Sequence, residues 1–248
     1  RLEYRGDDSA GVMIYNYYED QLHVTKTKGK VSDLEELIDE DADKKQGQIG
    51  IGHTRWATHG VPNDINSHPH TSQSGELVIV HNGIIENYDT IKKELIGHGY
   101  SFTSDTDTEV LVNLIEYVKN TERCKIGKAV QLALYNFVGA YAIAVFDKTK
   151  PNELVLARLG SPIAIGVGED FKEFFVASDA SPFVEYTKNA IYLEDEEMAI
   201  IKVGREVRVR RIDDDKLLDP TIQELQLSLD QIEKGGYDHF MLKEIHEQ

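Results

Sequence analysis

Residues 52–60 read GHTRWATHG and place Arg55 at the end of an apolar run. Three more polar stretches follow along the chain, NSHPH at 66–70, HNGIIEN at 81–87 and SDTDTE at 104–109. The last two add an Asn-Gly pair and an aspartate, again at the ends of apolar runs. An arginine, an amide donor and a carboxylate are the groups needed to grip a free amino acid and to stabilise an oxyanion. These stretches therefore predict one site with both abilities.

The segments around these stretches predict an α+β fold. Residues 77–80 form a continuous apolar run, as expected for a strand covered on both faces. Apolar residues recur at helical spacing over 106–118 and over 126–137. After Gly139 the pattern changes to short strands separated by turn residues. Strands outnumber helices and the two do not alternate regularly, which favours α+β over a doubly wound sheet.

Arg55 and Asp107 are the candidate amino-acid ligands. A planar guanidinium binds a carboxylate through two parallel hydrogen bonds, so Arg55 is predicted to clamp an α-carboxylate. The alternative for Arg55 is an ordinary surface ion pair. Asp107 lies in the first turn of a predicted helix and is the candidate counter-ion for an α-ammonium group. Its alternative role is to complement the helix dipole.

Asn82 and Gly83 are the candidate oxyanion donors. Asn-Gly is also a common two-residue hairpin turn, which is the structural alternative. However, residues 84–87 lead into a predicted helix and not into a returning strand. Two fixed donors aimed at a tetrahedral oxygen contribute a few kcal/mol each to catalysis. The placement of the pair therefore favours an oxyanion hole.

The four motifs, in this order, closely resemble the glutaminase domain of the glucosamine-6-phosphate synthase family. Further matches extend from LEYRG at 2–6 to YDHFMLKEI at 237–245, so the resemblance covers nearly the whole chain. It implies an amidohydrolase of the N-terminal-nucleophile class, or class II glutamine amidotransferase. It also implies a four-layer α-β-β-α sandwich of two mainly antiparallel sheets.

The resemblance assigns roles to individual residues. It places Arg55, Trp56, Thr58, His59, Gly83 and Asp107 around glutamine. Asn82 and Gly83 become the oxyanion hole, and Arg5 becomes a catalytic residue beside the nucleophile. Trp56 resembles a tryptophan that gates the passage of ammonia. Asp7 stands where the family usually has a tyrosine.

The nucleophile itself is the main departure from the family. The resemblance implies a first-residue cysteine followed by Gly-Ile-Val-Gly, whereas this sequence opens at Arg1. We therefore expect residues 1–248 by themselves to lack glutaminase activity. Cys124 is the only other thiol that the sequence offers. Because single cysteines are usually structural, we expect Cys124 to be a bystander.

The resemblance also implies a domain organisation and partners. Residues 1–235 are expected to form the glutaminase domain. Residues 236–248, which follow Gly235, are expected to be a linker towards a sugar-isomerase domain that binds fructose 6-phosphate. The expected ligand is L-glutamine, and the parent enzyme is expected to be a homo-oligomer.

Composition narrows the class of protein further. The formal charge of −17 argues against binding to nucleic acid. No apolar run approaches the roughly 20 residues that span a bilayer, which argues against a membrane protein. A single cysteine cannot form an internal disulfide, and this suits a reducing cytoplasm. We therefore expect a cytoplasmic enzyme domain.

Metal and nucleotide sites are the rival interpretations of these motifs. Five of the nine histidines fall between positions 53 and 81, but their spacing does not match a zinc motif. Glycines at 47, 50 and 52 mimic a phosphate-binding loop, yet no helix start follows them. No metal and no cofactor is therefore expected.

Three alternative functions remain open. The first is the glutaminase domain of a glutamine phosphoribosylpyrophosphate amidotransferase. That family usually has Tyr-Ser-Thr after His-Thr-Arg, so the residues at 56–58 argue against it. The second is a non-catalytic amino-acid-binding module, and the third is a metal-dependent hydrolase.

Overall fold

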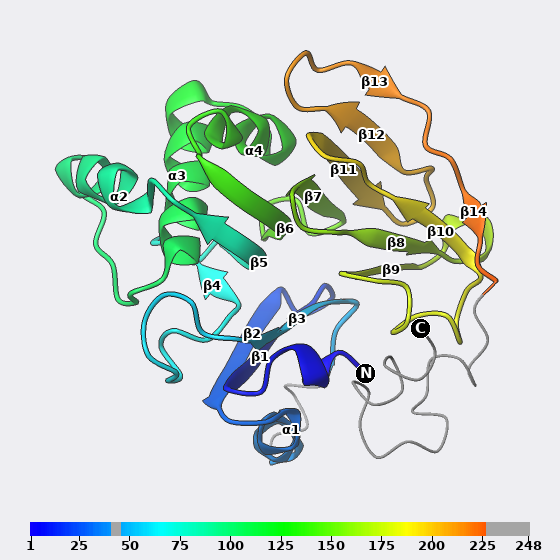
Figure 1. Cartoon of the computed structure of the whole chain (residues 1–248), viewed down its shortest axis with the longest axis horizontal. Coiled ribbons are helices and arrows are strands. Elements are labelled where there is room, and N and C mark those ends of the chain that lie inside the picture. Colours follow the sequence, from blue (N-terminus) through cyan, green and yellow to red (C-terminus); the bar gives the residue numbers. More distant parts are fainter. Residues whose placement is uncertain (41–45, 227–248) are drawn as a thin grey trace, which may run out of the picture.

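A seven-stranded antiparallel sheet runs through the middle of the molecule (Figure 1). The computed structural model describes residues 1–40 and 46–226. In order across the sheet, the strands are β13 (Leu217–Leu218), β12 (Arg208–Arg211), β11 (Glu197–Lys202), β7 (Glu153–Leu159), β6 (Gly139–Asp147), β5 (Leu77–Ile85) and β4 (His70–Thr71). The longest pairing joins β5 to β6, from Leu77 opposite Asp147 to Ile85 opposite Gly139.

Two smaller antiparallel sheets lie on one face of the large sheet. The first has the order β2 (Gln21–Lys28), β1 (Ser9–Asn16) and β3 (Ile49–Arg55). The second has the order β14 (Gln223–Glu224), β10 (Asn189–Tyr192), β8 (Ala164–Val167) and β9 (Phe174–Ala177). Consequently β3 and β9 are each the last strand of their sheet.

Helices cover the opposite face of the large sheet (Figure 1). They are α2 (Tyr88–Gly97), α3 (Asp107–Glu122) and α4 (Ile126–Leu134). The predicted cap of α3 is present, because the hydroxyl of Thr106 accepts a hydrogen bond from the backbone N–H of Glu109. The helix ends at Arg123, which adopts a left-handed conformation. A fourth helix, α1 (Val31–Asp39), packs against β1 and β2 on the outer side of the molecule.

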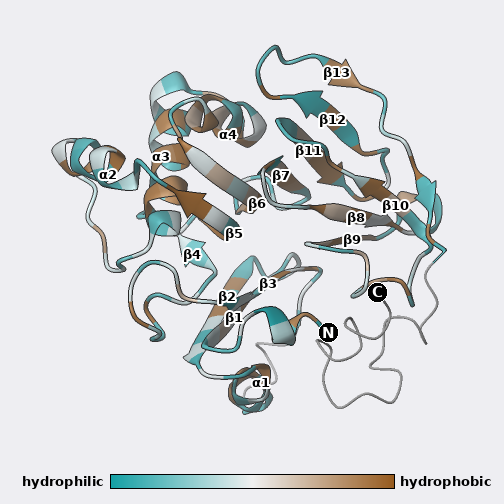
Figure 2. Ribbon diagram, in the orientation of Figure 1, coloured by the Kyte–Doolittle hydropathy of each residue, from teal (hydrophilic) through white to brown (hydrophobic). Residues whose placement is uncertain are grey.

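The core is divided by the large sheet. On the helix side, Ile79 and Val145 pack with Leu111 and Ile115 of α3. On the other side, Val78 and Phe146 pack against the β1 sheet, and a separate apolar cluster joins the large sheet to β8 and β10. Figure 2 shows the apolar residues along β5 and on α3. The molecule therefore has four layers, in the order α2 to α4, the large sheet, the two small sheets and α1. This order confirms the predicted α+β, four-layer sandwich.

Two features differ from the sequence-based expectation. The second sheet layer is divided into two hydrogen-bonded sheets, because no described strand joins β3 to β9. The strand expected at residues 77–80 continues to Ile85, so the Asn-Gly pair lies inside β5 and is not a hairpin turn. The expected domain boundary at residues 235 and 236 lies outside the described residues.

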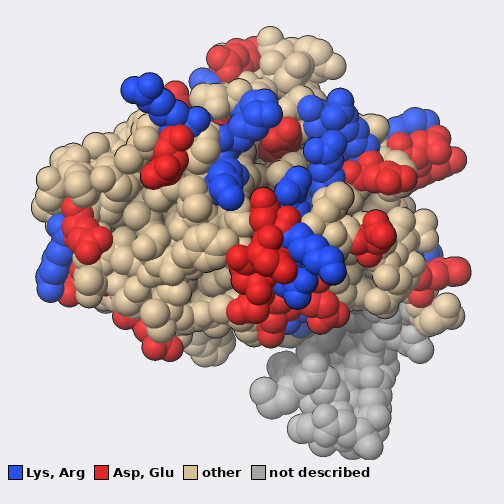
Figure 3. Space-filling model, turned by 90° about the horizontal axis from the view of Figure 1, so that it is seen from above, with Lys and Arg blue, Asp and Glu red and all other residues tan. Residues whose placement is uncertain are grey.

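The surface shown in Figure 3 carries both signs of charge. Basic side chains lie among acidic ones, and ion pairs such as Arg210–Asp215 and Arg211–Asp214 join them at β12 and the turn that follows. Within the described ranges, no helix is long and apolar enough to cross a membrane.

Candidate active site

A cavity of about 1100 Å³ lies between the two small sheets and reaches the first turn of α3. Its walls include residues of β3, β5, β6 and β9. Arg55, Asn82, Gly83 and Asp107 all line this central cavity. The structure therefore brings together the three kinds of group that the sequence analysis singled out.

Two strand edges border the central cavity. Strands β3 and β9 end their respective sheets, and residues of both line the cavity. An edge strand presents a row of backbone N–H and C=O groups that can pair with another extended segment. The apolar side chains of Val80, Ala142 and Ala144 form part of the cavity floor on the large sheet. The space therefore suits an extended peptide segment as well as a small ligand.

Arg55 is a buried cation with a free donor. Only 4% of its surface is exposed, although it ends β3 at the cavity. Its Nη2 donates to the carbonyl oxygens of His59 and Gly60. Its Nη1 is buried and has no hydrogen-bond partner among the described residues.

Two carboxylates near Arg55 favour the charged form of its guanidinium. Burial lowers the pKa of its guanidinium, and the carboxylates of Asp8 and Asp107 oppose that shift. An arginine stays protonated in proteins, so a buried and unused N–H donor costs free energy until an acceptor arrives. An anionic ligand in the central cavity would supply that acceptor.

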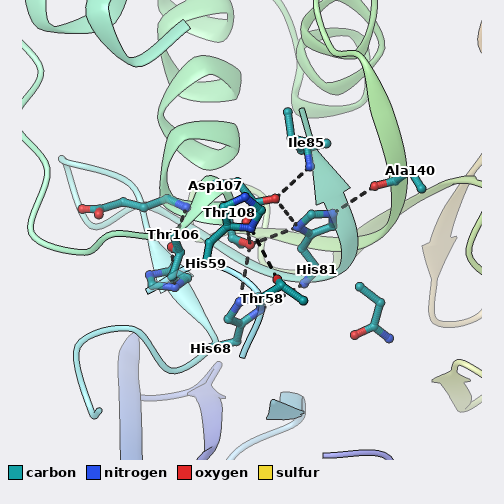
Figure 4. A network of polar contacts seen from close by, with 12 residues as sticks. Thr58, His59, His68, His81, Ile85, Thr106, Asp107, Thr108 and Ala140 are labelled. Atoms are coloured by element: carbon teal, nitrogen blue, oxygen red, sulfur yellow. Dashed lines mark hydrogen bonds and ion pairs between the residues drawn. The ribbon is translucent and has the colours of Figure 1, made fainter. Parts of the chain in front are cut away.

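Asp107 is held at the start of α3 (Figure 4). Its Oδ2 accepts a hydrogen bond of 2.8 Å from the backbone N–H of Ile85, and the residue is 4% exposed. Within residues 1–40 and 46–226, its Oδ1 accepts a single hydrogen bond, of 3.5 Å, from the hydroxyl of Thr108. A carboxylate here gains from the positive end of the helix dipole and still has acceptor capacity for a cationic group.

The Asn82–Gly83 pair lies in β5 and faces β6. Gly83 has φ of +127°, and a Cβ at this position would lie 2.2 Å from the carbonyl oxygen of Ala140. Only glycine fits this conformation and this close approach. The side chain of Asn82 is exposed to the cavity, and its Oδ1 accepts a hydrogen bond of 2.7 Å from Nε2 of His53.

Trp56, Thr58 and His59 occupy different places around the cavity. Trp56 lines it and is 67% exposed, and Thr58 also lines it. The ring of His59 instead lies edge-on against Tyr88, with 5.0 Å between ring centroids. His59 contributes its backbone carbonyl, which accepts from Arg55.

Arg5 bridges two segments at the cavity wall. It belongs to a short 3-10 helix, Glu3–Arg5, before β1. Its guanidinium pairs with Asp179 at 2.7 Å and donates to Oγ of Ser178 at 3.2 Å. Arg5 therefore ties the start of the described chain to the segment that follows β9.

Three buried histidines, His68, His70 and His81, lie near the first turn of α3, and two of them, His68 and His81, also line the cavity. Nδ1 of His81 lies 3.0 Å from the hydroxyl of Thr108 (Figure 4). Nε2 of His70 lies 3.0 Å from the hydroxyl of Thr106. His68 lies 3.4 Å from Thr108. Burial lowers the pKa of all three rings, so they are neutral near pH 7. Among the described residues, no group of three or more His, Cys, Asp or Glu is arranged to hold a metal ion.

The comparisons with known proteins agree with this geometry. The model of the glutamine amidotransferase domain family matches residues 38–208. The chain belongs to this family. It is 54% identical to the isomerising glutamine–fructose-6-phosphate aminotransferase of Bacteroides thetaiotaomicron and 49% identical to that of Chlorobaculum tepidum. Both matches cover 100% of this chain but only 39% and 40% of those proteins.

Solved structures of amidotransferases share the fold of this domain. The glutamine phosphoribosylpyrophosphate amidotransferase of B. subtilis superposes with a TM-score of 0.70 at 27% identity, over 86% of this chain and 45% of that one. A second structure, described as the allosteric regulatory enzyme of purine biosynthesis, has a TM-score of 0.71 at 28% identity. That match covers 86% of this chain and 44% of the other.

Cys124 of this amidotransferase domain lies away from the central cavity. It follows α3 and packs against the core between the helices and the large sheet. It is absent from the cavity walls, and burial raises the pKa of its thiol. A raised pKa makes a thiol less reactive at neutral pH. These observations support the expectation that Cys124 is a bystander.

The sequence analysis did not predict several residues that form hydrogen bonds with or beside the candidate site residues. The carboxylate of Asp8 accepts from the backbone N–H of Ala57, beside Arg55. Thr108 connects Asp107 to the buried histidines. His53 contacts Asn82. Asp8 stands in the same YRGDDSAG stretch as Arg5, which was a usable signal, whereas nothing in the sequence pairs His53 with Asn82.

Proposed function

We propose that this chain is the glutamine-hydrolysing domain of an isomerising glutamine–fructose-6-phosphate aminotransferase. The observation that carries the proposal is the buried Nη1 of Arg55, which has no hydrogen-bond partner among the described residues and belongs to the same cavity as the Asp107 carboxylate. A buried donor on a cation fits an α-carboxylate, and a nearby carboxylate fits an α-ammonium group. Together they select a free amino acid over a peptide.

The proposed arrangement assigns each site residue a role towards glutamine. Arg55 binds the α-carboxylate and Asp107 binds the α-ammonium group. Thr58 and Trp56 lie beside the ligand at the cavity wall. His59 acts through its backbone, because its carbonyl fixes the guanidinium of Arg55.

Asn82 and Gly83 stabilise the tetrahedral intermediate in this proposal. Attack on the side-chain amide of glutamine places negative charge on its carbonyl oxygen. The Nδ2 of Asn82 and the backbone N–H of Gly83 are the donors for that oxygen. Preorganised donors of this kind lower the barrier because they need no reorganisation during the reaction.

We place the attacking thiol on an extended segment outside residues 1–248, seated in the central cavity between β3 and β9. The thiol gives up its proton and adds to the amide carbon, the amide nitrogen takes up that proton and leaves as ammonia, and water then hydrolyses the thioester to glutamate and free thiol. The two strand edges and the apolar floor of the cavity support this location. Arg5 lies in the cavity wall, where it would position this segment.

The rest of the proposal concerns the whole enzyme. The chain spans about 40% of the length of the aminotransferases that it matches. Residues 1–235 form the hydrolase domain, and residues 236–248 lead to a domain that binds fructose 6-phosphate and receives ammonia. The enzyme is a cytoplasmic homo-oligomer, and the single cysteine of this chain suits that compartment.

Amino-acceptor specificity tests the proposal. The full-length protein is incubated with glutamine and either fructose 6-phosphate or phosphoribosylpyrophosphate, and glutamate and the aminated product are measured. We expect glucosamine 6-phosphate to form with fructose 6-phosphate. Amination of phosphoribosylpyrophosphate alone would identify the second family, whose structures share this fold. A protein that releases no glutamate under any condition would contradict the proposal.

A further inference from the structure

One hydrogen bond joins the two sheet layers at the cavity. His53 lies on β3 and Asn82 lies on β5, and Nε2 of His53 is 2.7 Å from Oδ1 of Asn82. The two ends of a carboxamide have nearly the same shape but opposite hydrogen-bonding character. Which end faces the cavity therefore depends on the partner of the other end.

The surroundings of His53 determine which ring nitrogen carries the proton. Burial lowers the pKa of His53 to about 4, so the ring is neutral near pH 7 and has one N–H. Its Nδ1 is buried and makes no hydrogen bond within the described part of the chain, although the backbone of His81 also interacts with the ring and opposes the effect of burial on its pKa. A proton on Nδ1 would be a buried, unsatisfied donor, which proteins rarely tolerate. The proton therefore sits on Nε2 and is donated to Oδ1 of Asn82.

The ring of His53 is itself held in place. It stacks on His68, with 4.3 Å between ring centroids and 18° between planes. His68 in turn lies 3.4 Å from the hydroxyl of Thr108, in the first turn of α3. This stack connects the carboxamide of Asn82 to the rigid start of the helix that also carries Asp107.

We infer that His53 is a positioning residue, which fixes the carboxamide of Asn82 so that its Nδ2 faces the central cavity. Nδ2 of Asn82 has no partner among the described residues, so it is available to a ligand oxygen. Without His53, the carboxamide turns freely and presents its oxygen to the developing oxyanion for part of the time. This inference rests on the proposed function, because it assumes that Asn82 is an oxyanion donor.

Two substitutions of similar length separate the donor from the bulk of His53. In the full-length enzyme, His53→Gln keeps an N–H at the end of an unbranched side chain, and His53→Met has none. We expect His53→Met to lower the kcat of glutamine hydrolysis at least about tenfold, with the KM for glutamine changed less than about twofold. His53→Gln should retain most of the kcat. His23→Met on the outer strand β2 is the matched control and should behave like the parent.

A double-mutant cycle distinguishes positioning from a general structural effect. In an Asn82→Ala background the carboxamide is gone, so His53→Met should lower kcat by less than about twofold further. If His53→Met lowered kcat by the same factor in the parent and in the Asn82→Ala background, the inference would be overturned. A kcat of His53→Gln as low as that of His53→Met would also overturn it. If His53→Met does not fold, as judged by thermal melting, His53→Gln still tests the inference. A loss of kcat in His53→Gln as large as that in Asn82→Ala would overturn the inference.

The same measurements separate the two proposals. If Asn82→Ala hydrolyses glutamine at the parent rate, the oxyanion assignment fails and the role of His53 fails with it. If Asn82→Ala is impaired but His53→Met is not, the proposed function stands and the positioning role alone is wrong.

Discussion

The two faces of the large sheet have opposite properties. The helix face is closed, because Ile79 and Val145 are fully buried against α3 and α4. The opposite face is closed only at its two flanks, where the small sheets pack, and holds the central cavity between them. Strand β5 contributes to both, because Ile79 is buried against the helices, whereas Val80 and Asn82 line the cavity. The period-2 alternation of side chains along Ile79, Val80 and Asn82 thus separates a group in the core from groups at the cavity.

Asn82→Asp should have the largest effect, and this effect should be on activity at the open face and not on stability. Aspartate replaces the donor by an acceptor with negative charge, next to a developing oxyanion. We expect kcat of the full-length enzyme to fall at least about a hundredfold, measured as glutamate release, with little change in the melting temperature. Because Asn82 lies inside β5 and not in a turn, a parallel loss of fold and activity would instead mean that it supports the strand.

Arg55→Lys and Asp107→Asn should have the next largest effects, which should appear as weaker binding of glutamine. Lysine cannot reproduce the paired hydrogen bonds of a guanidinium, and asparagine removes the charge opposite an ammonium group. Each change should weaken glutamine binding roughly tenfold to a hundredfold, measured by calorimetry. Lys93→Gln, in an exposed ion pair on α2, is the control and should bind normally. Parent-like affinity in either site variant would refute the corresponding contact.

Ile79→Val on the closed face should have a smaller effect, and it should lower stability without changing glutamine binding. The substitution removes one buried methylene group from the core against the helices. We expect a loss of about 0.5–1.5 kcal/mol in unfolding free energy by urea titration. Glutamine affinity should not change. A changed affinity with unchanged stability would show that the two faces are not separate in the way described.

The buried histidines predict a dependence of stability on acid. Folding lowers the pKa of His53 to about 4, and burial also lowers the pKa of His68, His70 and His81. A lowered histidine pKa means that the unfolded chain binds protons first. Stability is therefore present above about pH 6.5 and declines as the pH falls towards 4. The urea midpoint should be lower at pH 5 than at pH 7.5, and less so in His53→Gln; an unchanged midpoint would contradict the burial of neutral rings.

The sequence analysis singled out residues that line one cavity, but it did not predict the strands around them. Arg55 and Asp107 stand where local signals are strong, at a strand end and at a helix cap, and both line the cavity. The continuation of β5 through Gly83 was not predicted, because Asn-Gly favours turns and only the pairing with β6 overrides that preference. The gap between β3 and β9 was also beyond prediction, since it depends on contacts between distant segments.

The central claim is that Arg55 recognises the α-carboxylate of free glutamine, and one substrate comparison tests it most directly. The full-length enzyme and its Arg55→Met variant are assayed with L-glutamine and with 4-aminobutanamide, which lacks that carboxylate. The parent should prefer glutamine roughly tenfold to a hundredfold in kcat/KM. The variant should prefer it less than about threefold, because the group that reads the carboxylate is gone. The same preference in both proteins would contradict the claim.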